Sequence, residues 1–295
     1  MTAGLASLAV AAPVATAATP RTCGSAPAPK TVAYKRVAGV AAKLTSLDLY
    51  APSRACRRGR KTPVVMWVHG GAYAVGDKAT QIRDKVRLFT RRGYVFVSVN
   101  YRLSRPGRPN TANYPDHFRD VGAAVAWVHR NIGRSGGDRT RVALLGHSAG
   151  ADIVANVTTN PRWLRERALR LKAVRCAGPL DTEGFDKEAA GTRQQAQWQR
   201  AFPNLPTYAR DTSAVNLIRR GIGTPRTITA FRGTPQRQAI EKRFAAVLRS
   251  AGVKVTLIDA RGLSHAEVNR RIGASGDAVM IPPLLSFLRR CFARR

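Results

Sequence analysis

The chain has 295 residues, of which 44% are hydrophobic, and its 50 Lys and Arg residues against 17 Asp and Glu residues give a formal net charge of +33. This length is enough to bury a core, and the apolar content excludes a disordered polycation, because such a chain lacks the side chains that offset the entropy of ordering. The basic residues occur without a basic zipper, zinc-finger spacing or an aromatic RNA-binding stretch. We therefore expect a folded protein with no specific nucleic-acid partner, whose charge favours electrostatic association with anionic envelope polymers.

The first 19 residues carry no charged side chain and contain the small residues Ala15, Thr16 and Ala17 near their end. This pattern is typical of the apolar part of a secretory signal followed by a cleavage site, although the basic residues that normally precede it are missing. The segment is too short for a membrane span, and no other segment approaches the length required. The sequence therefore predicts a secreted or extracytoplasmic protein without a transmembrane span.

Four cysteines fit an exported protein: Cys23, Cys56, Cys176 and Cys291. Their spacing contains no Cys-x-x-Cys metal site, and an even number of cysteines in an exported chain indicates disulfides. Three pairings are allowed, of which we favour Cys23 with Cys56 and Cys176 with Cys291. Free buried thiols are the alternative for the second pair.

Apolar runs alternate with helical patterns along most of the chain. Residues 31–37 and 43–50 alternate as half-exposed strands do, and later apolar runs are rich in β-branched residues, as is typical of strands buried on both faces. The buried strands are predicted at 64–68, 94–99, 142–145, 171–176, 227–231 and 253–258, and the helices at 80–91, 117–131, 149–157, 237–250 and 278–290. The alternation predicts an α/β fold with a mostly parallel sheet flanked by helices, and ligands bind at the carboxyl ends of such strands.

The alternation is interrupted between residues 181 and 225, a polar stretch that carries Trp198, Phe202 and Tyr208. It contains two short helical patterns and is too long for a crossover loop. We interpret it as a small helical lid inserted into a single domain that spans residues 31–295. The three aromatic side chains line an acyl pocket or pack the lid onto the helices below it.

A Gly-His-Ser-Ala-Gly motif occupies residues 146–150, directly after a predicted strand and at the start of a predicted helix. In this context the two glycines permit a sharp strand-to-helix turn that presents the Ser148 hydroxyl at the helix N-terminus. An ordinary glycine-rich turn is the alternative. The motif predicts that Ser148 is a nucleophile.

His69, Gly70 and Gly71 directly follow the predicted strand 64–68. A glycine pair exposes backbone N–H groups with no side chain between them and a substrate. Together with the N–H of Ala149, those of Gly70 and Gly71 are predicted to form an oxyanion hole. His69 precedes this hole, so an orienting or structural role is expected for it.

Elimination among the five histidines leaves one candidate base. His147 is the variable residue of the serine motif, His69 belongs to the glycine loop, and His117 and His129 lie on a predicted helix. His265 follows the last predicted strand, where a loop can bring its imidazole over the serine as general base. A surface-loop histidine without a catalytic role is the alternative.

Several motifs follow one another along the chain in the order in which they occur in a known superfamily. They are Leu-Asp-Leu-Tyr-Ala-Pro at 47–52, the strand and His-Gly-Gly-Ala-Tyr segment at 64–78, residues 94–104, Tyr114-Pro115-Asp116, Asp120, Trp127 and the serine motif. Over residues 47–265 the chain resembles the α/β-hydrolase superfamily, and within it the hormone-sensitive-lipase-like carboxylesterases and the bifunctional feruloyl and acetyl-xylan esterases. The resemblance implies an α/β-hydrolase fold and a Ser/His/acid hydrolase that acts on esters without a cofactor or metal.

The sequence departs from this family at the acid. The family's His-Gly-x-x-Asp stretch is matched by residues 232–236, where Gln236 takes the place of the aspartate. A neutral amide would not stabilise the imidazolium form of His265. Asp181, just beyond the predicted strand 171–176, is our candidate, since some hydrolases of this fold take their acid from that strand. Asp259, Glu183, Asp186, Glu267 and the absence of any acid are the alternatives, and a helix-capping role is the alternative for Asp181.

We therefore predict a secreted serine hydrolase that cleaves carboxylic esters through an acyl-enzyme. Its substrate would be a small-molecule or polysaccharide-linked ester. Because Gln236 replaces the family acid, the main alternative is a catalytically weak or inactive binding module of the cell envelope. A peptidase of the same fold is a further alternative.

Overall fold

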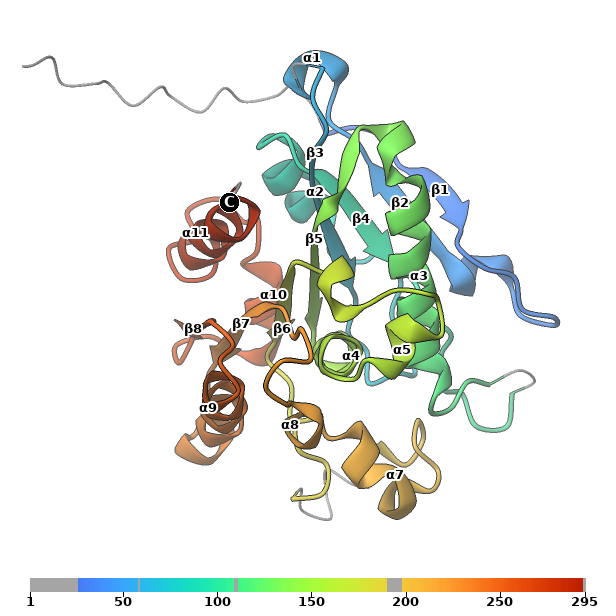
Figure 1. Cartoon of the computed structure of the whole chain (residues 1–295), viewed down its shortest axis with the longest axis vertical. Coiled ribbons are helices and arrows are strands. Elements are labelled where there is room, and N and C mark those ends of the chain that lie inside the picture. The colour runs from blue at the N-terminus through green and yellow to red at the C-terminus, as the bar shows by residue number, and fades with distance from the viewer. Residues whose placement is uncertain (1–25, 58, 109–110, 190–197, 294–295) are drawn as a thin grey trace, which may run out of the picture.

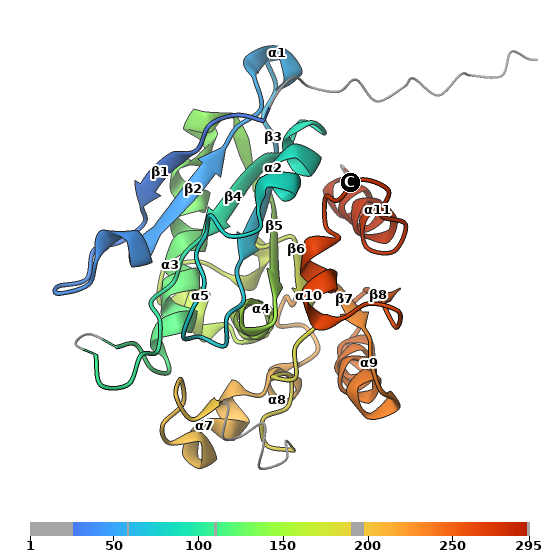
Figure 2. The ribbon, with the colours of Figure 1, turned by 180° about the vertical axis from the view of Figure 1, so that it is seen from behind.

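The structure is a computed structural model that describes residues 26–57, 59–108, 111–189 and 198–293. The signal-like segment 1–19 and Cys23 lie outside the described residues. One central sheet has helices on both of its faces (Figures 1 and 2). The predicted α/β architecture with a mostly parallel sheet is confirmed.

The sheet has eight strands in the order β1-β2-β4-β3-β5-β6-β7-β8. They are β1 (Lys30–Ala33), β2 (Ser46–Tyr50), β3 (Thr62–Val68), β4 (Val95–Val99), β5 (Gly137–His147), β6 (Cys176–Leu180), β7 (Arg226–Phe231) and β8 (Val255–Asp259). β1 pairs with β2, and β2 with β4, in antiparallel fashion, whereas all the other pairs are parallel. The carboxyl ends of β3 and of β5 to β8 therefore meet at one edge of the sheet, where the predicted site residues lie.

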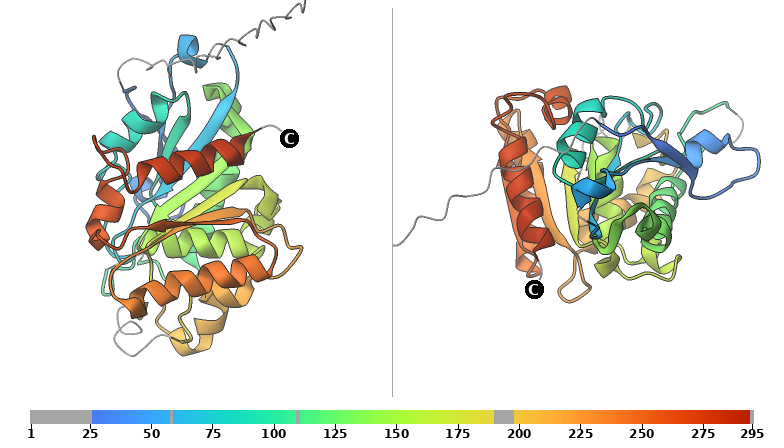
Figure 3. Two further views of the ribbon diagram at one scale, coloured as in Figure 1. Left: turned by 90° about the vertical axis from the view of Figure 1, so that its left-hand side faces the viewer. Right: turned by 90° about the horizontal axis from the view of Figure 1, so that it is seen from above.

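Helices cover the sheet in two layers (Figure 3). The helices of the main body are α1 (Arg54–Arg57), α2 (Arg83–Thr90), α3 (Asp116–Asn131), α4 (Ala149–Thr159), α5 (Arg162–Arg165), α9 (Pro235–Ser250), α10 (His265–Arg270) and α11 (Ile281–Phe292). Buried side chains of α3, α4 and α5 form one core with the sheet, and those of α2, α10 and α11 form another on the opposite face. Successive residues of β3 enter these two cores in turn, because the side chains of a strand alternate between its faces.

β6 begins where the sequence predicted a strand to end. Residues Leu171–Ala173 form a 3₁₀ turn, and the strand runs through Gly178 and Pro179, two residue types that are depleted in strands. β6 pairs with β7 only through Cys176 and Ala177, so Pro179 lies where β6 has already left β7. A Cβ on Gly178 would lie 2.4 Å from a methyl carbon of Leu145, which explains the glycine.

The predicted disulfide between Cys176 and Cys291 is present and joins the start of β6 to α11, with the two Cα atoms 6.3 Å apart. The predicted pairing of Cys23 with Cys56 cannot be followed, since Cys23 is not among the described residues. No helix within the described ranges is both long and apolar enough to cross a membrane.

The segment predicted as a lid contains two short helices, α7 (Leu205–Thr212) and α8 (Ala214–Leu217). Phe202 is buried with its ring 5.4 Å from that of Tyr73, edge to face, and the Tyr208 ring lies 4.7 Å from that of Tyr114. These two aromatic residues pack the segment onto the body of the protein. Trp198 instead lines the cavity described next.

Candidate active site

Ser148 lies at the sharp turn between β5 and α4, with φ 58° and ψ −125°. A positive φ is unfavourable for a residue with a side chain, and it persists where the surroundings enforce it. A Cβ on Gly146 would lie 2.4 Å from the carbonyl oxygen of Gly150, and one on Gly150 would lie 2.3 Å from that of Val68. Both glycines of the motif are thus required for the turn that exposes Ser148.

Ser148 and His265 line the same cavity, which has a volume of about 360 Å³. Ser148 is the N-cap residue of α4, so its hydroxyl lies at the positive end of the helix dipole. Within the described residues the hydroxyl makes no hydrogen bond, and catalytic hydrogen bonds are often loose before a substrate binds. The structure thus places the predicted nucleophile and the predicted base in one cavity.

His265 is the first residue of α10, whereas the sequence analysis expected a loop at this position. Ser264 caps the helix and forms a reciprocal capping box with Glu267. The Ser-x-x-Glu signal for this helix was present in the sequence and was missed. A capped helix fixes the backbone of His265 more firmly than a loop would.

The Nδ1 atom of His265 lies 2.6 Å from Oδ2 of Asp181. Because a carboxylate only accepts, Nδ1–H is the donor, and in the neutral imidazole this tautomer makes Nε2 the nitrogen that can accept a proton. The predicted pair of base and acid is thus in hydrogen-bonding contact. Asp181 follows β6, is fully buried and has φ 58°.

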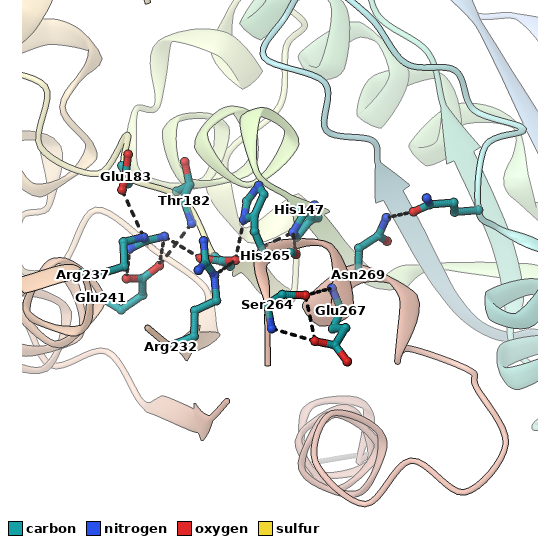
Figure 4. Close-up of polar contacts among 12 residues, drawn as sticks. His147, Thr182, Glu183, Arg232, Arg237, Glu241, Ser264, His265, Glu267 and Asn269 are labelled. Atoms are coloured by element: carbon teal, nitrogen blue, oxygen red, sulfur yellow. Dashed lines mark hydrogen bonds and ion pairs between the residues drawn. The ribbon is translucent and has the colours of Figure 1, made fainter. Parts of the chain in front are cut away.

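Two arginines that the sequence analysis did not single out also bind Asp181. Arg232 Nε donates to Oδ2 over 2.5 Å, and Arg237 Nη2 donates to Oδ1 over 2.6 Å (Figure 4). Burial alone would raise the pKa of Asp181, but the hydrogen bond from His265, the charge of Arg237 and the hydrogen bond from Arg232 lower it below the usual value. Asp181 is therefore held as a carboxylate.

The other candidate acids have different partners, and none among the described residues hydrogen-bonds to His265. Gln236 is exposed on α9. Asp259 is paired with Arg261, Asp186 with Arg243, Glu183 with Arg237, and Glu267 belongs to the capping box of α10. Asp181 is the candidate that the geometry favours.

The predicted oxyanion-hole residues border Ser148. A Cβ on Gly70 would lie 3.0 Å from Cβ of Ser148, so the backbone of Gly70 approaches the serine closely. Gly71 has φ 117°, and a Cβ there would lie 2.0 Å from the carbonyl oxygen of Val75. Within the described chain no hydrogen-bond acceptor takes the N–H groups of Gly70 and Gly71. With the N–H of Ala149 at the start of α4, they can serve as donors to an oxyanion.

His69 and His147 support the site without acting as its base. The His69 ring is buried and stacks on Tyr101 with the ring centroids 4.5 Å apart, in keeping with a structural role. His147 Nε2 donates to the backbone oxygen of His265 over 2.8 Å. Burial, followed by the nearby His265, lowers the pKa of His147 to about 3, so its ring stays neutral and helps to hold α10.

One group within the described residues has the composition of a metal site. His147, Asp181 and His265 offer ligand atoms that lie within 4.8 Å of one another. A cation there would have to displace the two guanidinium groups that already bind Asp181. The donor set is therefore better suited to proton transfer than to a metal.

A buried ionic network forms another wall of the cavity and was missed by the sequence analysis. Asp152 accepts hydrogen bonds from the Tyr73 hydroxyl and from Lys187 Nζ, the latter over 2.7 Å. Burial raises the pKa of Asp152 and lowers that of Lys187, while each charge favours the other. An aspartate inside the apolar start of α4 was the available signal, because a buried carboxylate needs partners.

Comparison with known proteins gives partial matches in sequence. The model of the carboxylesterase family matches residues 44–191. Mouse (Mus musculus) carboxylesterase 3B is 38% identical over 120 residues, which are 39% of this chain and 20% of that protein. Fumonisin B1 esterase of Sphingopyxis macrogoltabida is 33% identical over 160 residues, or 50% of this chain and 29% of that protein. The chain spans only about a fifth of the length of bile salt-activated lipases that it also matches.

Comparison with solved structures covers most of the chain. Esterase B from Lactobacillus Rhamnosis superposes with a TM-score of 0.71 at 19% identity, over 93% of this chain and 87% of that one. A bacterial heroin esterase superposes with a TM-score of 0.70 at 20% identity, over 90% and 85% of the two chains. The fold is therefore the α/β-hydrolase fold, as the resemblance implied.

Proposed function

Since the chain belongs to the carboxylesterase family, we propose that it is a serine hydrolase that cleaves carboxylic esters through an acyl-enzyme. The observation that carries this proposal is the hydrogen bond from His265 to Asp181 at the cavity that Ser148 lines. A nucleophile, a base of fixed tautomer and a buried carboxylate are the three groups that acyl transfer requires.

In the first half-reaction, the Ser148 oxygen attacks the ester carbonyl while Nε2 of His265 takes the hydroxyl proton. The carbonyl oxygen becomes an oxyanion that the N–H groups of Gly70, Gly71 and Ala149 stabilise. His265 is then an imidazolium, and the Asp181 carboxylate beside it offsets the new positive charge. The bond to the leaving alcohol breaks as His265 returns the proton to the alcohol oxygen.

In the second half-reaction, water attacks the acyl-Ser148 ester by the same route. Nε2 of His265 takes one proton of the water, and the resulting tetrahedral species collapses to the carboxylic acid. The proton on His265 returns to the Ser148 oxygen, so the enzyme is regenerated. Water is the co-reactant, and no step requires an oxidant or reductant.

Within the superfamily, a relation to hormone-sensitive-lipase-like carboxylesterases or to feruloyl and acetyl-xylan esterases is a narrower proposal. It is supported by the order of motifs from residue 47 to residue 265 and by the fold shared with small esterases. We propose small-molecule or polysaccharide-linked esters as substrates. The cavity of about 360 Å³ is of a size to hold a short acyl chain or a small alcohol.

A fluorophosphonate probe tests the function directly. The full chain is incubated with the probe, and the adduct is located by peptide mass spectrometry, with Ser148→Ala as the matched control. We expect one adduct on Ser148, and turnover of p-nitrophenyl acetate that Ser148→Ala lowers by at least 10⁵-fold. A folded wild-type protein that gains no adduct would contradict the proposal.

The binding-module alternative has one observation in its favour, the replacement of the family acid by Gln236. It predicts no turnover of any ester by a protein whose fold is intact. The peptidase alternative predicts cleavage of a p-nitroanilide amide at a rate comparable with that of the matching ester. We expect ester turnover to exceed amide turnover by several orders of magnitude.

We further propose that the protein acts outside the cytoplasm, where anionic envelope polymers attract its basic surface. The Cys176–Cys291 disulfide supports an oxidising compartment. Fractionation of cells that express the full chain checks both points. Recovery in the envelope fraction with release at high salt would support them, whereas recovery in the cytoplasm with reduced thiols would contradict export.

A further inference from the structure

One wall of the active-site cavity contains guanidinium donors that the protein itself does not use. Arg232 lines the cavity and donates from Nε to Asp181, with its side chain 20% exposed. Its Nη1 and Nη2 groups have no hydrogen-bond acceptor among the described residues. Ion pairing with Asp181 thus fixes the direction of the guanidinium and leaves its outer edge free.

Arg237, on the same wall, has one guanidinium nitrogen without a hydrogen-bond partner among the described residues. Its side chain is buried, and its Nη groups are committed to Asp181 and Glu241. Its Nε lies in the buried interior without a hydrogen-bond partner in the described structure. A carboxylate oxygen of Glu183 lies 3.5 Å from this nitrogen, which is beyond a good hydrogen bond.

We propose that this wall binds a carboxylate of the substrate, so that the enzyme prefers esters that carry a second, anionic group. Arg232 is the specificity-determining residue, and its two free Nη groups form the fork that a carboxylate matches. Glu183, on the same wall, opposes this preference. This inference rests on the proposed esterase function and names the substrate class.

The charges around the wall support the assignment. Asp181 is one carboxylate faced by two guanidinium groups, and its remaining partner is the imidazole of His265. Burial raises the pKa of Glu241 to about 8, which reduces the negative charge it offers to Arg237 near neutral pH. Glu183 lies on the same wall and pairs with Arg237, so the guanidinium that is left for an incoming anion is that of Arg232.

The geometry also indicates where the substrate's carboxylate would lie relative to its ester group. Arg232 Nε and His265 Nδ1 both contact Oδ2 of Asp181, so the guanidinium lies close to the base. Ser148 lines the same cavity. A substrate can thus place its ester at Ser148 and, several bonds away, a carboxylate at Arg232. The carboxylate belongs either to the acyl part or to the alcohol part of the ester.

Two pairs of substrates measure the preference for an anionic ester. They also show whether the carboxylate belongs to the acyl part or to the alcohol part. For the acyl part, release of ethanol is compared between monoethyl adipate and ethyl hexanoate. For the alcohol part, release of acetate is compared between 4-acetoxybutanoate and butyl acetate. The readout is the ratio of kcat/KM for the anionic ester to that for its neutral partner. We expect this ratio to be about ten or more in at least one pair.

Variants test whether Arg232 produces that ratio. Arg232→Gln also disturbs Asp181, but this loss affects both esters of a pair and cancels in the ratio. We expect Arg232→Gln to lower the ratio about tenfold, Arg232→Lys to retain part of it, and Glu183→Gln to raise it. Arg130→Gln is the matched control, because it removes one exposed positive charge from the end of α3.

The opposite effects of Arg232→Gln and Glu183→Gln are not expected if Arg232 only holds Asp181 in place. A wild-type ratio near one in both pairs, or an equal ratio in wild type and Arg232→Gln, would overturn this inference. In that case hydrolysis of the neutral esters and labelling of Ser148 would still support the esterase. Loss of both neutral hydrolysis and labelling would overturn the esterase proposal itself.

Discussion

The neighbouring strands β6 and β7 differ in the charge of the residues that follow them, and the acid follows the other strand from the one that the resemblance predicts. The family motif places the acid after β7, yet this chain has Arg232 and Gln236 there, and Asp181 follows β6. Asp181 contacts His265, while Arg232 and Arg237 reach back from the β7 side to bind the same carboxylate. The end of β6 thus supplies the negative charge, and the end of β7 supplies the charges that hold it.

This difference indicates that the position of the carboxylate relative to the base matters more than the strand that carries it. Parallel strands end at the same edge of a sheet, so a residue after either strand can reach His265. The exchange has a structural cost, because Asp181 is fully buried and needs compensating charges. Four changes, at these two strand ends and at the start of β6, test this view.

Replacement of Asp181 by Asn should have the largest effect. Asn keeps the size of the side chain but cannot offset the charge of the imidazolium, and loss of the acid from such a triad lowers kcat by about 10⁴-fold. Steady-state turnover of p-nitrophenyl acetate measures the effect, with thermal unfolding as the control for folding. A loss below tenfold in a folded variant would mean that Asp181 is not the acid.

Removal of the disulfide should weaken the protein while sparing its chemistry. Cys176 and Cys291 are separated by 115 residues, and opening a loop of this size costs about 5 kcal/mol of stability. Cys176 starts β6 whereas Asp181 follows its other end, so we expect kcat/KM of the folded Cys176→Ser/Cys291→Ser protein to stay within threefold of wild type. Urea unfolding and esterase assays measure the two effects. A large loss of activity in folded protein would show that this link positions the acid.

Replacement of Arg237 by Gln should destabilise the protein in a pH-dependent way. It leaves the buried Asp181 and Glu241 with one guanidinium fewer, which we expect to cost about 3 kcal/mol at pH 7. The pKa of Asp181 is lowered in the folded protein, so its stabilising contribution is present above the pKa of the unfolded chain and is lost as the pH falls through the folded pKa.

The difference in unfolding free energy between wild type and Arg237→Gln should therefore shrink as the pH falls below about 4. Urea unfolding between pH 3 and pH 7 measures it, and Arg130→Gln is the matched control for the loss of one positive charge. A difference that does not change with pH would mean that Arg237 stabilises the fold through packing and not through Asp181.

Much of this arrangement could be predicted from the sequence, because it depends on local patterns. The alternation of apolar runs indicated the parallel sheet, the Gly-x-Ser-x-Gly motif indicated the turn at Ser148, and elimination led to His265. The start of β6 was predicted too early, since Gly178 and Pro179 interrupt its strand pattern. The helix at His265 was missed although Ser264 and Glu267 form a capping box.

The partners of Asp181 could not have been found in this way. Arg232 and Arg237 stand 51 and 56 residues away from it in the sequence, and their contact depends on how β6 and β7 lie side by side. A chain with 50 basic residues offers no local signal that marks these two. The position of Asp152 in an apolar helix start indicates that it needs a partner, but Lys187 could not be identified as that partner for the same reason.

Replacement of Gln236 by Ala should have the smallest effect, although this position carries the acid in the related family. The Gln236 side chain is exposed near the start of α9, and His265 is already bonded to Asp181. We expect kcat/KM within twofold of wild type and a change in unfolding free energy below about 0.5 kcal/mol. Gln236→Asp in the Asp181→Asn background is the sharper measurement, because it restores a carboxylate at the family position. If activity returned, the two strand ends would be interchangeable in this chain. We expect no recovery, since Arg232 and Arg237 would compete with His265 for the new carboxylate.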